Sequence, residues 1–536
     1  MTTDVPDFDL KIKNYRCFSD HRPVHIAMRK GFTALIGVNN SGKSALLEFL
    51  FDLRDIFGQM ANNSNLWVNA LRPGNSFNFA KAISIRDASE LFCNANSRDM
   101  TIELSISKEL NQDCNAYLPD RIVLTIANRT NTCMPQIVLN GEILEIAPDV
   151  GISSNGTNIY NISDIRVDFS GYIRAFRALH DTMYIGPFRN AINVGGKKDY
   201  FDITIGQQFI ESWLALKTGD NTKDNKLVLD LTDDIAKIFR FNRLEINASQ
   251  DKSTLKVFID GKTYRLDELG SGLAQFIIVL GNVAQKKPSW VLIDEPELNL
   301  HPSLQIDFLT TLTNYSSYGI LFSTHNIGLA RACAERIYSF RLDDNQLSEV
   351  RDLEAIQNLS EFLGELSFSG YRELGFDKVL LVEGPTDVRT VQQFLRKYRK
   401  DHEILLLPLG GSSLINATSE AELEEIKRIT NNVYALIDSE KKYANAPIQK
   451  KRQSFIGICD KVGIKCHILQ YRAIENYFTD RAVKAVKGEN YSALQPYDKL
   501  ADAYPGWGKS ENWRIAREMS IKEIKQTDIG EFIDSL

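Results

Sequence analysis

The stretch Gly37-Val38-Asn39-Asn40-Ser41-Gly42-Lys43-Ser44 fits the pattern G-x-x-x-x-G-K-[ST] at every fixed position. An apolar run over 32–36 precedes it, as expected of a buried strand, and 45–50 follows it as an expected helix. The glycines let the backbone curl, so that consecutive N–H groups and the helix N-terminus face a triphosphate. In such a loop Lys43 reaches the β- and γ-phosphates and the Ser44 hydroxyl binds Mg²⁺. The sequence therefore predicts an ATP site whose contact residues are Asn39, Asn40, Ser41, Gly42, Lys43 and Ser44.

Length and charge limit the class of protein. The chain has 536 residues, and a prior of about 150 residues per domain predicts three or four folded units. Its hydrophobic content of 43% and charged content of 25% are those of an ordinary globular protein. A net charge of -6 argues against a wholly basic nucleic-acid coat, although local basic patches can still bind phosphate.

Cysteine usage and hydropathy indicate the compartment. Seven cysteines are scattered without a C-x-x-C pair, so neither a disulfide framework nor a zinc ribbon is expected. A reducing cytoplasm is the simplest location. The first 15 residues are polar and acidic, unlike a signal peptide. Since no apolar run approaches the roughly 18 residues of a membrane span, we expect no membrane partner.

Alternating and periodic segments predict the elements around the phosphate loop. Short strands are expected at 8–12 and 24–26, and antiparallel strands with polar, Asn-rich turns over about 60–180. Two amphipathic helices are expected over 204–240. They are either an inserted dimerisation element or the outer layer of the nucleotide-binding domain.

A glycine-rich segment begins a predicted helix after a hairpin at 254–265. The segment is Glu268-Leu269-Gly270-Ser271-Gly272-Leu273-Ala274-Gln275. Free N–H groups at a helix start can bind an anion, so Ser271 and Gly272 are candidate nucleotide contacts, although an ordinary cap fits them as well. Arg189, which follows a short strand, is likewise either a phosphate contact or a surface arginine.

Two buried strands end in polar residues that suit ATP hydrolysis. The run 290–297, WVLIDEPE, places Asp294 near the Mg²⁺ held by Ser44 and lets Glu295 polarise the attacking water. The run 321–325, LFSTH, ends in His325, which would sense or hold the γ-phosphate. We therefore expect Glu295 and His325 to be catalytic and Asp294 to be a ligand of the nucleotide-bound metal.

The phosphate loop, the glycine-rich segment at 268–275 and the runs 290–297 and 321–325 occur in the order found in ABC-type ATPases, including the recombination branch. The segment 14–18, NYRCF, also resembles the N-Y-R-x-F opening of that branch. The resemblance covers residues 8 to about 345. In that family two heads sandwich ATP, with each signature facing the partner's phosphate loop, so the resemblance implies a homodimer. The signature here reads SGLAQ over 271–275 in place of the usual L-S-G-G-Q, and 299–302, NLHP, occupies the position of the family's dimer-facing loop.

After a connector at 346–375, strands and helices alternate again. A buried strand at 378–382 runs into Glu383-Gly384-Pro385-Thr386-Asp387, with a helix expected from Val388 to Tyr398. Another strand, 433–437, runs into Asp438-Ser439-Glu440. The repeated β-α unit predicts a small parallel sheet with acidic residues at the carboxyl ends of two strands.

Carboxylates at one sheet edge repel each other unless a cation lies among them, and Mg²⁺ and Mn²⁺ prefer oxygen ligands. Glu383, Asp387, Asp438 and Glu440 are therefore expected to hold one or two divalent ions. Two ions about 4 Å apart can activate a water and stabilise the leaving 3′ oxygen of a phosphodiester. Each acid alone also fits a turn, and the spaced set favours the metal site. Nearby basic residues either follow a DNA backbone or form a solvated face: Arg396, Lys397, Arg399, Lys400, Lys441, Lys442, Lys450, Lys451 and Arg452.

The order E-G-x-x-D then D-x-[DE] resembles the Toprim domain of topoisomerases, primases and some nucleases, with Glu440 in place of the usual last Asp. An ATPase of this kind joined to a C-terminal Toprim resembles the OLD (overcoming lysogenisation defect) family, whose members include nuclease components of antiphage systems such as Gabija and certain retrons. The resemblance implies that Glu475, in 472–477, assists the metal site. It also implies a late basic residue near the scissile phosphate, for which Lys509 is the candidate.

Together these observations predict an α/β chain. An ABC- or recombination-type ATPase head at 1–345, with a β-rich part and the helical insert, is followed by a linker at 346–375 and a Toprim nuclease domain at 376–536. The favoured function is an ATP-binding, Mg²⁺- or Mn²⁺-dependent DNA endonuclease in which the ATPase dimer controls access of DNA to the Toprim site.

Two other functions stay open at this point. One is a chromosome-maintenance-like clamp or repair protein whose Toprim does not cut, and the other is a topoisomerase-like or primase-like Toprim enzyme. The family resemblance further implies a partner from an antiphage defence system, either a helicase or a reverse transcriptase with its nucleic acid.

Overall fold

The computed structural model describes residues 5–536 except 38, 83–84, 107–115, 147–151, 155–158, 163–164, 188–200, 299, 344, 353–377, 402, 410–419 and 430–431. Arg189, Asn299 and most of the predicted linker lie outside the described residues. The chain forms two compact units. The first unit comprises Met1–His301, Thr311–His325 and Tyr338–Asp352, and the second unit comprises Pro302–Thr310, Asn326–Ile337 and Leu353–Leu536. Because these units interleave along the chain, the predicted domain boundaries at 345 and 376 stay predictions.

A seven-stranded sheet forms the β-rich part of the first unit, and each of its strand pairs is antiparallel. Inward-facing apolar residues alternate with more exposed ones along its strands, as on a sheet with one buried face. This confirms the antiparallel strands expected over 60–180. Its strands, in spatial order, are β2 (Val24–Met28), β1 (Phe8–Lys13), β5 (Met100–Ile106), β6 (Arg121–Ile126), β7 (Thr132–Leu139) and β4 (Phe77–Asn78), with β8 (Glu142–Ile143) paired to β7.

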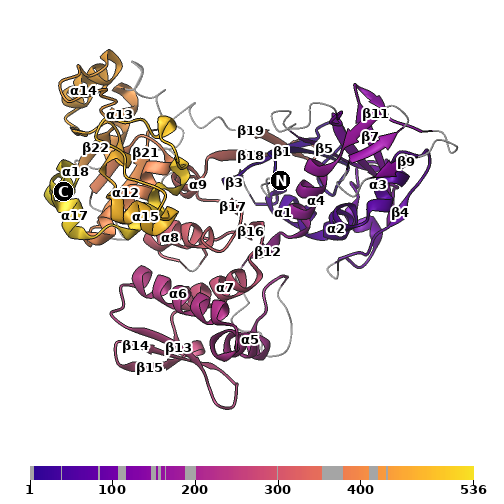
Figure 1. Cartoon of the computed structure of the whole chain (residues 1–536), viewed down its shortest axis with the longest axis horizontal. Coiled ribbons are helices and arrows are strands. Elements are labelled where there is room, and N and C mark those ends of the chain that lie inside the picture. The colour runs from indigo at the N-terminus through magenta and orange to yellow at the C-terminus, as the bar shows by residue number, and fades with distance from the viewer. Residues whose placement is uncertain are drawn as a thin grey trace. The chain divides into compact units, whose positions relative to one another are not determined.

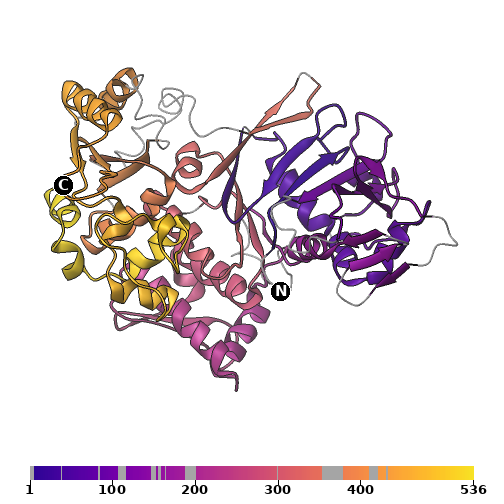
Figure 2. The same cartoon turned by 45° about the horizontal axis from the view of Figure 1, so that its top comes forward.

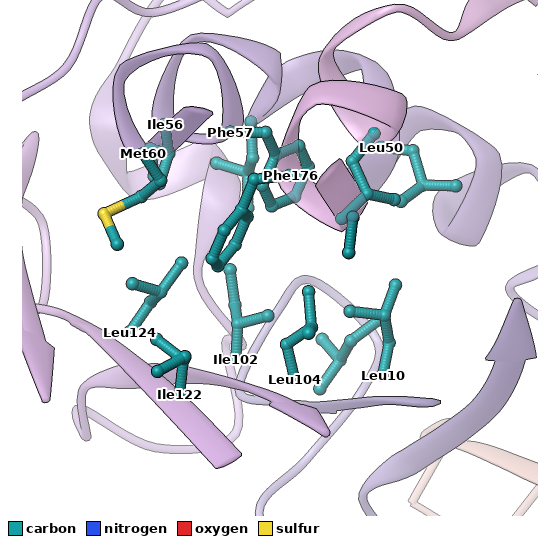
Figure 3. Close-up of a cluster of buried hydrophobic side chains, with 14 of the residues drawn as sticks. Leu10, Leu50, Ile56, Phe57, Met60, Ile102, Leu104, Ile122, Leu124 and Phe176 are labelled. Carbon is teal, nitrogen blue, oxygen red and sulfur yellow. The ribbon is translucent and has the colours of Figure 1, made fainter. Parts of the chain in front are cut away.

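Helices cover the buried face of this sheet. Figure 3 shows Leu50, Phe57 and Phe176 on the helices, pointing toward Ile102 and Leu124 on the strands. Each large apolar side chain buried in this way contributes about 1.5–3 kcal/mol. This core holds the helix that follows the phosphate loop. The helices are α1 (Lys43–Asp52), α2 (Arg54–Asn62) and α4 (Ser170–His180).

A second, six-stranded sheet carries the nucleotide motifs. In spatial order its strands are β12 (Met183–Ile185), β16 (Trp290–Asp294), β17 (Gly319–Thr324), β3 (Gly31–Gly37), β18 (Arg336–Leu342) and β19 (Ser348–Asp352). The first four are parallel, and Asp294 pairs in register with Ser323 while Thr324 pairs with Ile36. The carboxyl ends of β3, β16 and β17 therefore meet at one edge of the sheet.

The expected amphipathic helices and hairpin are present in the first unit. The helices over 204–240 are separated only by 219–221, and Asp260 and Gly261 form the hairpin turn with φ of 46° and 87°. The helix that follows the hairpin was expected over 276–284 and begins earlier, at Ser271. These elements are α5 (Gly206–Thr218), α6 (Thr222–Phe239), β13 (Leu244–Ala248), β14 (Leu255–Ile259), β15 (Lys262–Arg265) and α7 (Ser271–Lys286). The first unit also contains α3 (Ser64–Ala70), β9 (Ile152–Ser154), β10 (Ile159–Ile162) and β11 (Ile165–Asp168).

The second unit is built on a four-stranded, fully parallel sheet, which confirms the repeated β-α unit. Figures 1 and 2 show its orange strands among the orange and yellow helices. The strands, in spatial order, are β21 (Ile404–Pro408), β20 (Lys378–Val382), β22 (Val433–Ile437) and β23 (Lys465–Ile468). The helices are α8 (Pro302–Leu312), α9 (Ile327–Cys333), α12 (Pro385–Lys397), α13 (Glu420–Ile429), α14 (Lys450–Val462), α15 (Asp480–Lys487), α16 (Asn512–Glu518), α17 (Ile521–Lys525) and α18 (Asp528–Ser535).

The start of α12 differs from the sequence prediction. The helix begins at Pro385, before the expected Val388, because proline suits the first helical position and the Asp387 carboxylate caps the turn. Its Oδ2 accepts the Gly384 N–H at 3.0 Å. This hydrogen bond holds the Asp387 carboxylate near Gly384, which follows the end of β20. None of the helices among the described residues has the length and apolarity needed to cross a membrane.

Candidate nucleotide site and acidic cluster

The phosphate loop has the backbone that its glycines predict. Gly42 has φ of 101°, and a Cβ there would come within 2.4 Å of Ser348 Oγ. Ser348 Oγ also donates to the Ser41 carbonyl at 2.6 Å, which fixes the loop. The Ser41 hydroxyl is buried without a hydrogen-bond partner in the described structure. A buried orphan hydroxyl and a close-packed glycine fit a loop that receives phosphate oxygens. Asn39 and Asn40, by contrast, are exposed.

Lys43 and Ser44 begin α1 at the edge where the parallel strands end. Lys43 Nζ donates to the Gly37 carbonyl at 2.9 Å, and the Ser44 hydroxyl hydrogen-bonds the Asp294 carboxylate. Burial lowers the pKa of Lys43 and raises that of Asp294, so each charge is partly desolvated in this structure. A phosphate beside Lys43 and a Mg²⁺ between Ser44 and Asp294 would each relieve such a penalty. The residues present therefore fit a Mg-nucleotide.

Glu295 and His325 lie beside this lysine. His325 Nε2 is 3.2 Å from Glu295 Oε1 and 3.4 Å from Lys43 Nζ. Glu297, which we had not singled out in the sequence, holds the histidine segment: its carboxylate accepts the Thr324 hydroxyl at 2.6 Å and the His325 N–H at 3.1 Å. The structure thus brings the predicted pair together. Neither hydrophobic period nor polarity indicates a role for Glu297, because that role depends on the neighbouring strand.

Ser271 and Gly272 lie on a different element from the phosphate loop. They open α7 after Gly270, and the Ser271 side chain is exposed to solvent. The contact of these residues with a nucleotide stays a prediction, because the resemblance places that nucleotide on the phosphate loop of a second copy of the chain.

In the second unit, the carboxyl ends of β20 and β22 bring acidic residues together. The two strands are paired in parallel, and the Asp438 N–H donates to Glu383 Oε1 at 2.9 Å. The Asp438 carboxylate accepts the Ile474 N–H at 3.2 Å, which brings in the turn that carries Glu475. Glu475 Oε1 is 3.3 Å from Lys509 Nζ. We call Glu383, Asp387, Asp438, Glu475 and Lys509 the acidic cluster.

Burial and mutual repulsion shift the pKa values of the carboxyl groups in the acidic cluster. Burial, together with the charges of Glu383, Asp387 and Glu475, raises the pKa of Asp438 well above its usual range. Burial also raises the pKa of Asp387 to about 7. Burial lowers the pKa of Lys509, but the neighbouring carboxylates outweigh this and raise it overall. Lys509 therefore supplies the cluster with one positive charge, while Asp387 and Asp438 hold their protons more tightly than exposed carboxyl groups do.

Two arginines take part in this region: Arg452, which the sequence indicated only as part of a basic set, and Arg472, which it did not single out. Arg452 of α14 is buried and forms an ion pair with Glu383. Arg472 forms an ion pair with Glu440, whose backbone N–H donates to the Arg472 carbonyl at 2.9 Å. Glu440 is thus paired with Arg472 and not with a member of the acidic cluster.

The donor chemistry of the acidic cluster fits a divalent cation, because its ligands are oxygen atoms and its buried carboxylates repel one another. As the side chains stand, no group of three or more His, Cys, Asp or Glu residues in the described parts of the chain is arranged to hold a metal ion. Glu383 would first have to leave Arg452. The predicted site residues are therefore neighbours, in an arrangement that differs from a preformed metal cage.

Comparisons with known proteins match the first part of the chain to ATPases. Residues 9–175 match a family described as an AAA ATPase domain. Residues 161–331 match a family described as an AAA domain of an AbiEii toxin of a type IV toxin–antitoxin system. Each match covers less than half of the chain.

The chain is also similar to a nuclease. It is 23% identical to the Old nuclease of Escherichia phage P2 over 415 residues, which are 70% of this chain and 68% of that protein. Among solved structures, it resembles an Smc head bound to the C-winged helix domain of ScpA, with TM-score 0.39, 14% identity and coverage of 65% and 98%. It also resembles the SMC head domain from Thermotoga maritima, with TM-score 0.31, 15% identity and coverage of 65% and 99%. Scores this low do not establish a common fold.

The matched residues include β3, β12, β16 and β17 of the six-stranded sheet, together with the phosphate loop, Asp294 and Glu295. Residues 9–331 are therefore similar to ATPase domains of the AAA type, and the chain is distantly similar to the Old nuclease.

Proposed function

We propose that this chain is an ATP-binding, divalent-metal-dependent DNA endonuclease of the OLD type. The observation that carries the proposal is the acidic cluster at the carboxyl ends of β20 and β22, in a chain that also holds a nucleotide site. The distant likeness to the Old nuclease of a phage supports the same reaction class. A role in defence against phage, with a helicase or a reverse transcriptase and its nucleic acid as partner, follows from the family resemblance and is part of the proposal.

The residues of the acidic cluster divide the chemistry among them. Asp387, Asp438 and Glu475 would hold Mg²⁺ or Mn²⁺, joined by Glu383 once it leaves Arg452 and by Glu440 once it leaves Arg472. The cation would activate a water and neutralise charge at the phosphodiester. Because burial raises the pKa values of Asp387 and Asp438, these residues would release protons as the cation binds. Lys509 would place its ammonium at the scissile phosphate.

Helices of the second unit offer a path from the nucleotide to the cluster. α9 follows His325 directly after its cap residue, Asn326, whose side chain accepts the Leu329 N–H at 3.0 Å. α9 packs against α12, and Asp387 lies in the first turn of α12. Movement of the His325 segment would therefore be passed to α12. We propose that the ATPase, acting as a head-to-head homodimer, controls DNA access to the cluster in this way.

Two ion pairs, each with at least one buried side chain, join α12 to the segments that follow the ATPase motifs. Arg389 is 1% exposed and pairs with Glu335, just beyond α9. Arg396 pairs with Asp307 of α8, which is also 1% exposed. A buried pair loses about 3–5 kcal/mol when one partner is removed, so these contacts hold a defined geometry.

The coupling is tested with Arg389→Gln. We expect ATP hydrolysis and nucleotide-free cleavage to stay within about 2-fold of wild type, since neither site loses a side chain. The ratio of cleavage rates with and without ATP should fall toward one. The measurement is cleavage of a defined duplex with ATP, with a non-hydrolysable analogue and with no nucleotide. Arg481→Gln, which breaks the more exposed ion pair between Arg481 of α15 and Glu523 of α17, is the matched control. A wild-type ATP response in Arg389→Gln would contradict this path.

The reaction itself is tested with supercoiled plasmid. Wild-type protein in Mg²⁺ or Mn²⁺ is expected to nick or linearise the plasmid, and EDTA should stop the reaction. DNA binding without cleavage in either metal, at every nucleotide state, would favour the clamp with a non-cutting Toprim. A covalent protein–DNA adduct trapped by denaturation would favour a topoisomerase.

A further inference from the structure

A cavity of about 380 Å³ opens in the second unit, and its lining includes Arg472, which lies three residues before Glu475 of the acidic cluster in the chain. Its volume lies within the range of roughly 300–1,000 Å³ that is usual for small-molecule sites. Its lining combines cations, one aromatic ring and two carboxylates. These residues are Lys442, Arg472, Tyr497, Asp498, Lys499 and Asp502.

The cavity shares its walls with the segments that carry the cluster. Lys442 follows the turn after Asp438, and Arg472 precedes the turn that carries Glu475. Arg472 joins these walls, since it donates to the Lys441 carbonyl at 3.2 Å and its N–H donates to the Pro496 carbonyl at 2.8 Å. A chain of phosphates that passes the cluster would therefore continue past this cavity.

The ring of Tyr497 is held by other aromatic rings. It packs edge-to-face on Tyr471 at 6.5 Å between centroids, and Tyr471 stacks on Tyr477 at 4.6 Å. Tyr497 is half-buried, so its ring contacts Tyr471 while part of its surface stays accessible. A fixed aromatic face next to cations is the arrangement on which a single-stranded base stacks.

The charges select the kind of ligand. Lys442, Arg472 and Lys499 are balanced by Asp498, Asp502 and the Glu440 carboxylate that pairs with Arg472. A near-neutral cavity disfavours a triphosphate but accommodates one phosphodiester charge beside the lysines. Its carboxylates can accept hydrogen bonds from the amino groups of a base.

We propose that this cavity binds one unstacked nucleotide of the DNA strand next to the nucleotide at which the acidic cluster cuts. The base stacks on Tyr497, and Lys442 and Lys499 hold its phosphate. This inference rests on the proposed nuclease function for its DNA partner and adds a preference for unpaired strands. The same chemistry would also accept a free mononucleotide, which the experiment distinguishes.

The test measures binding without cleavage. Fluorescence anisotropy in EDTA follows a labelled 12-nucleotide single strand and its duplex, with the full chain as wild type, Tyr497→Ala, Tyr497→Phe and Lys499→Ala. Tyr497→Ala should weaken single-strand binding about 5- to 100-fold, whereas Tyr497→Phe should stay within about 2-fold because the ring is kept. Lys499→Ala should lower the slope of log affinity against log salt by about 0.7. Tyr117→Ala, an exposed tyrosine in the first unit, is the matched control.

Equal single-strand affinity of wild type and Tyr497→Ala, with both melting at the same temperature, overturns the proposal. So does equal weakening for single strand and duplex. Loss of binding in Tyr497→Phe as well would assign the effect to packing and also overturns it. Competition by millimolar deoxynucleoside monophosphate, but none by unlabelled single strand, would identify a free nucleotide as the ligand and overturn the DNA assignment. Because the test measures binding and not cleavage, it can support or overturn this proposal even if the protein has no nuclease activity.

Discussion

Substitution of Asp438 by asparagine is expected to lower metal-dependent DNA cleavage at least about 1,000-fold, which corresponds to about 4 kcal/mol of transition-state stabilisation. Asp438 lies at the centre of the acidic cluster: its N–H donates to Glu383, its carboxylate accepts from Ile474, and it lies among the charges of Asp387 and Glu475. Asparagine keeps the shape of the side chain but removes its charge. The loss should therefore appear in the rate of cleavage and leave the fold intact.

Initial cleavage rates of a labelled duplex in Mn²⁺, with circular dichroism as a check on folding, measure this effect. Glu440→Gln is the informative comparison, because Glu440 pairs with Arg472 in the structure. We expect it to cost less than Asp438→Asn. An equal loss would mean that Glu440 leaves Arg472 and joins the site when metal binds. Cleavage by Asp438→Asn at the wild-type rate would remove the acidic cluster from the reaction.

Replacing Lys43 by alanine is expected to reduce ATP hydrolysis about 100- to 1,000-fold, the usual cost of removing a charge-stabilising donor from a transition state. Lys43 Nζ lies between the Gly37 carbonyl and His325, where no other cation of the phosphate loop can replace it. Because the acidic cluster keeps all of its side chains, nucleotide-free cleavage should stay within about 2-fold of wild type.

Phosphate release and cleavage are measured on the same preparations. Glu295→Gln separates binding from hydrolysis, because it removes the proposed water-polarising carboxylate but keeps Lys43 for the phosphates. If ATP alters cleavage by Lys43→Ala as it does by wild type, the proposed control of the nuclease by the ATPase is wrong.

Local patterns predicted the elements on which these experiments depend. The apolar strands at 290–294 and 319–324 and the phosphate loop are recognisable because buried parallel strands need continuous apolar runs and the loop needs its glycines. The helices over 204–240 are recognisable from their hydrophobic period. The Asp260-Gly261 turn is recognisable because aspartate and glycine tolerate the positive φ angles that the turn has. The start of α12 was missed by three residues because the cap formed by Asp387 lay outside the apolar pattern used to predict it.

What the sequence alone determined is therefore the order of strands, loops and helices and the residue types at the two candidate sites, since period, turn residues and motif spacing act within a short stretch of chain. Tertiary structure decided which charges meet. Arg452 forms an ion pair with Glu383, Arg472 forms one with Glu440, and Arg389 of α12 forms one with Glu335. These pairs join residues far apart in the chain, and a buried charge takes whichever partner the packed strands and helices bring within reach. No local pattern specifies that partner.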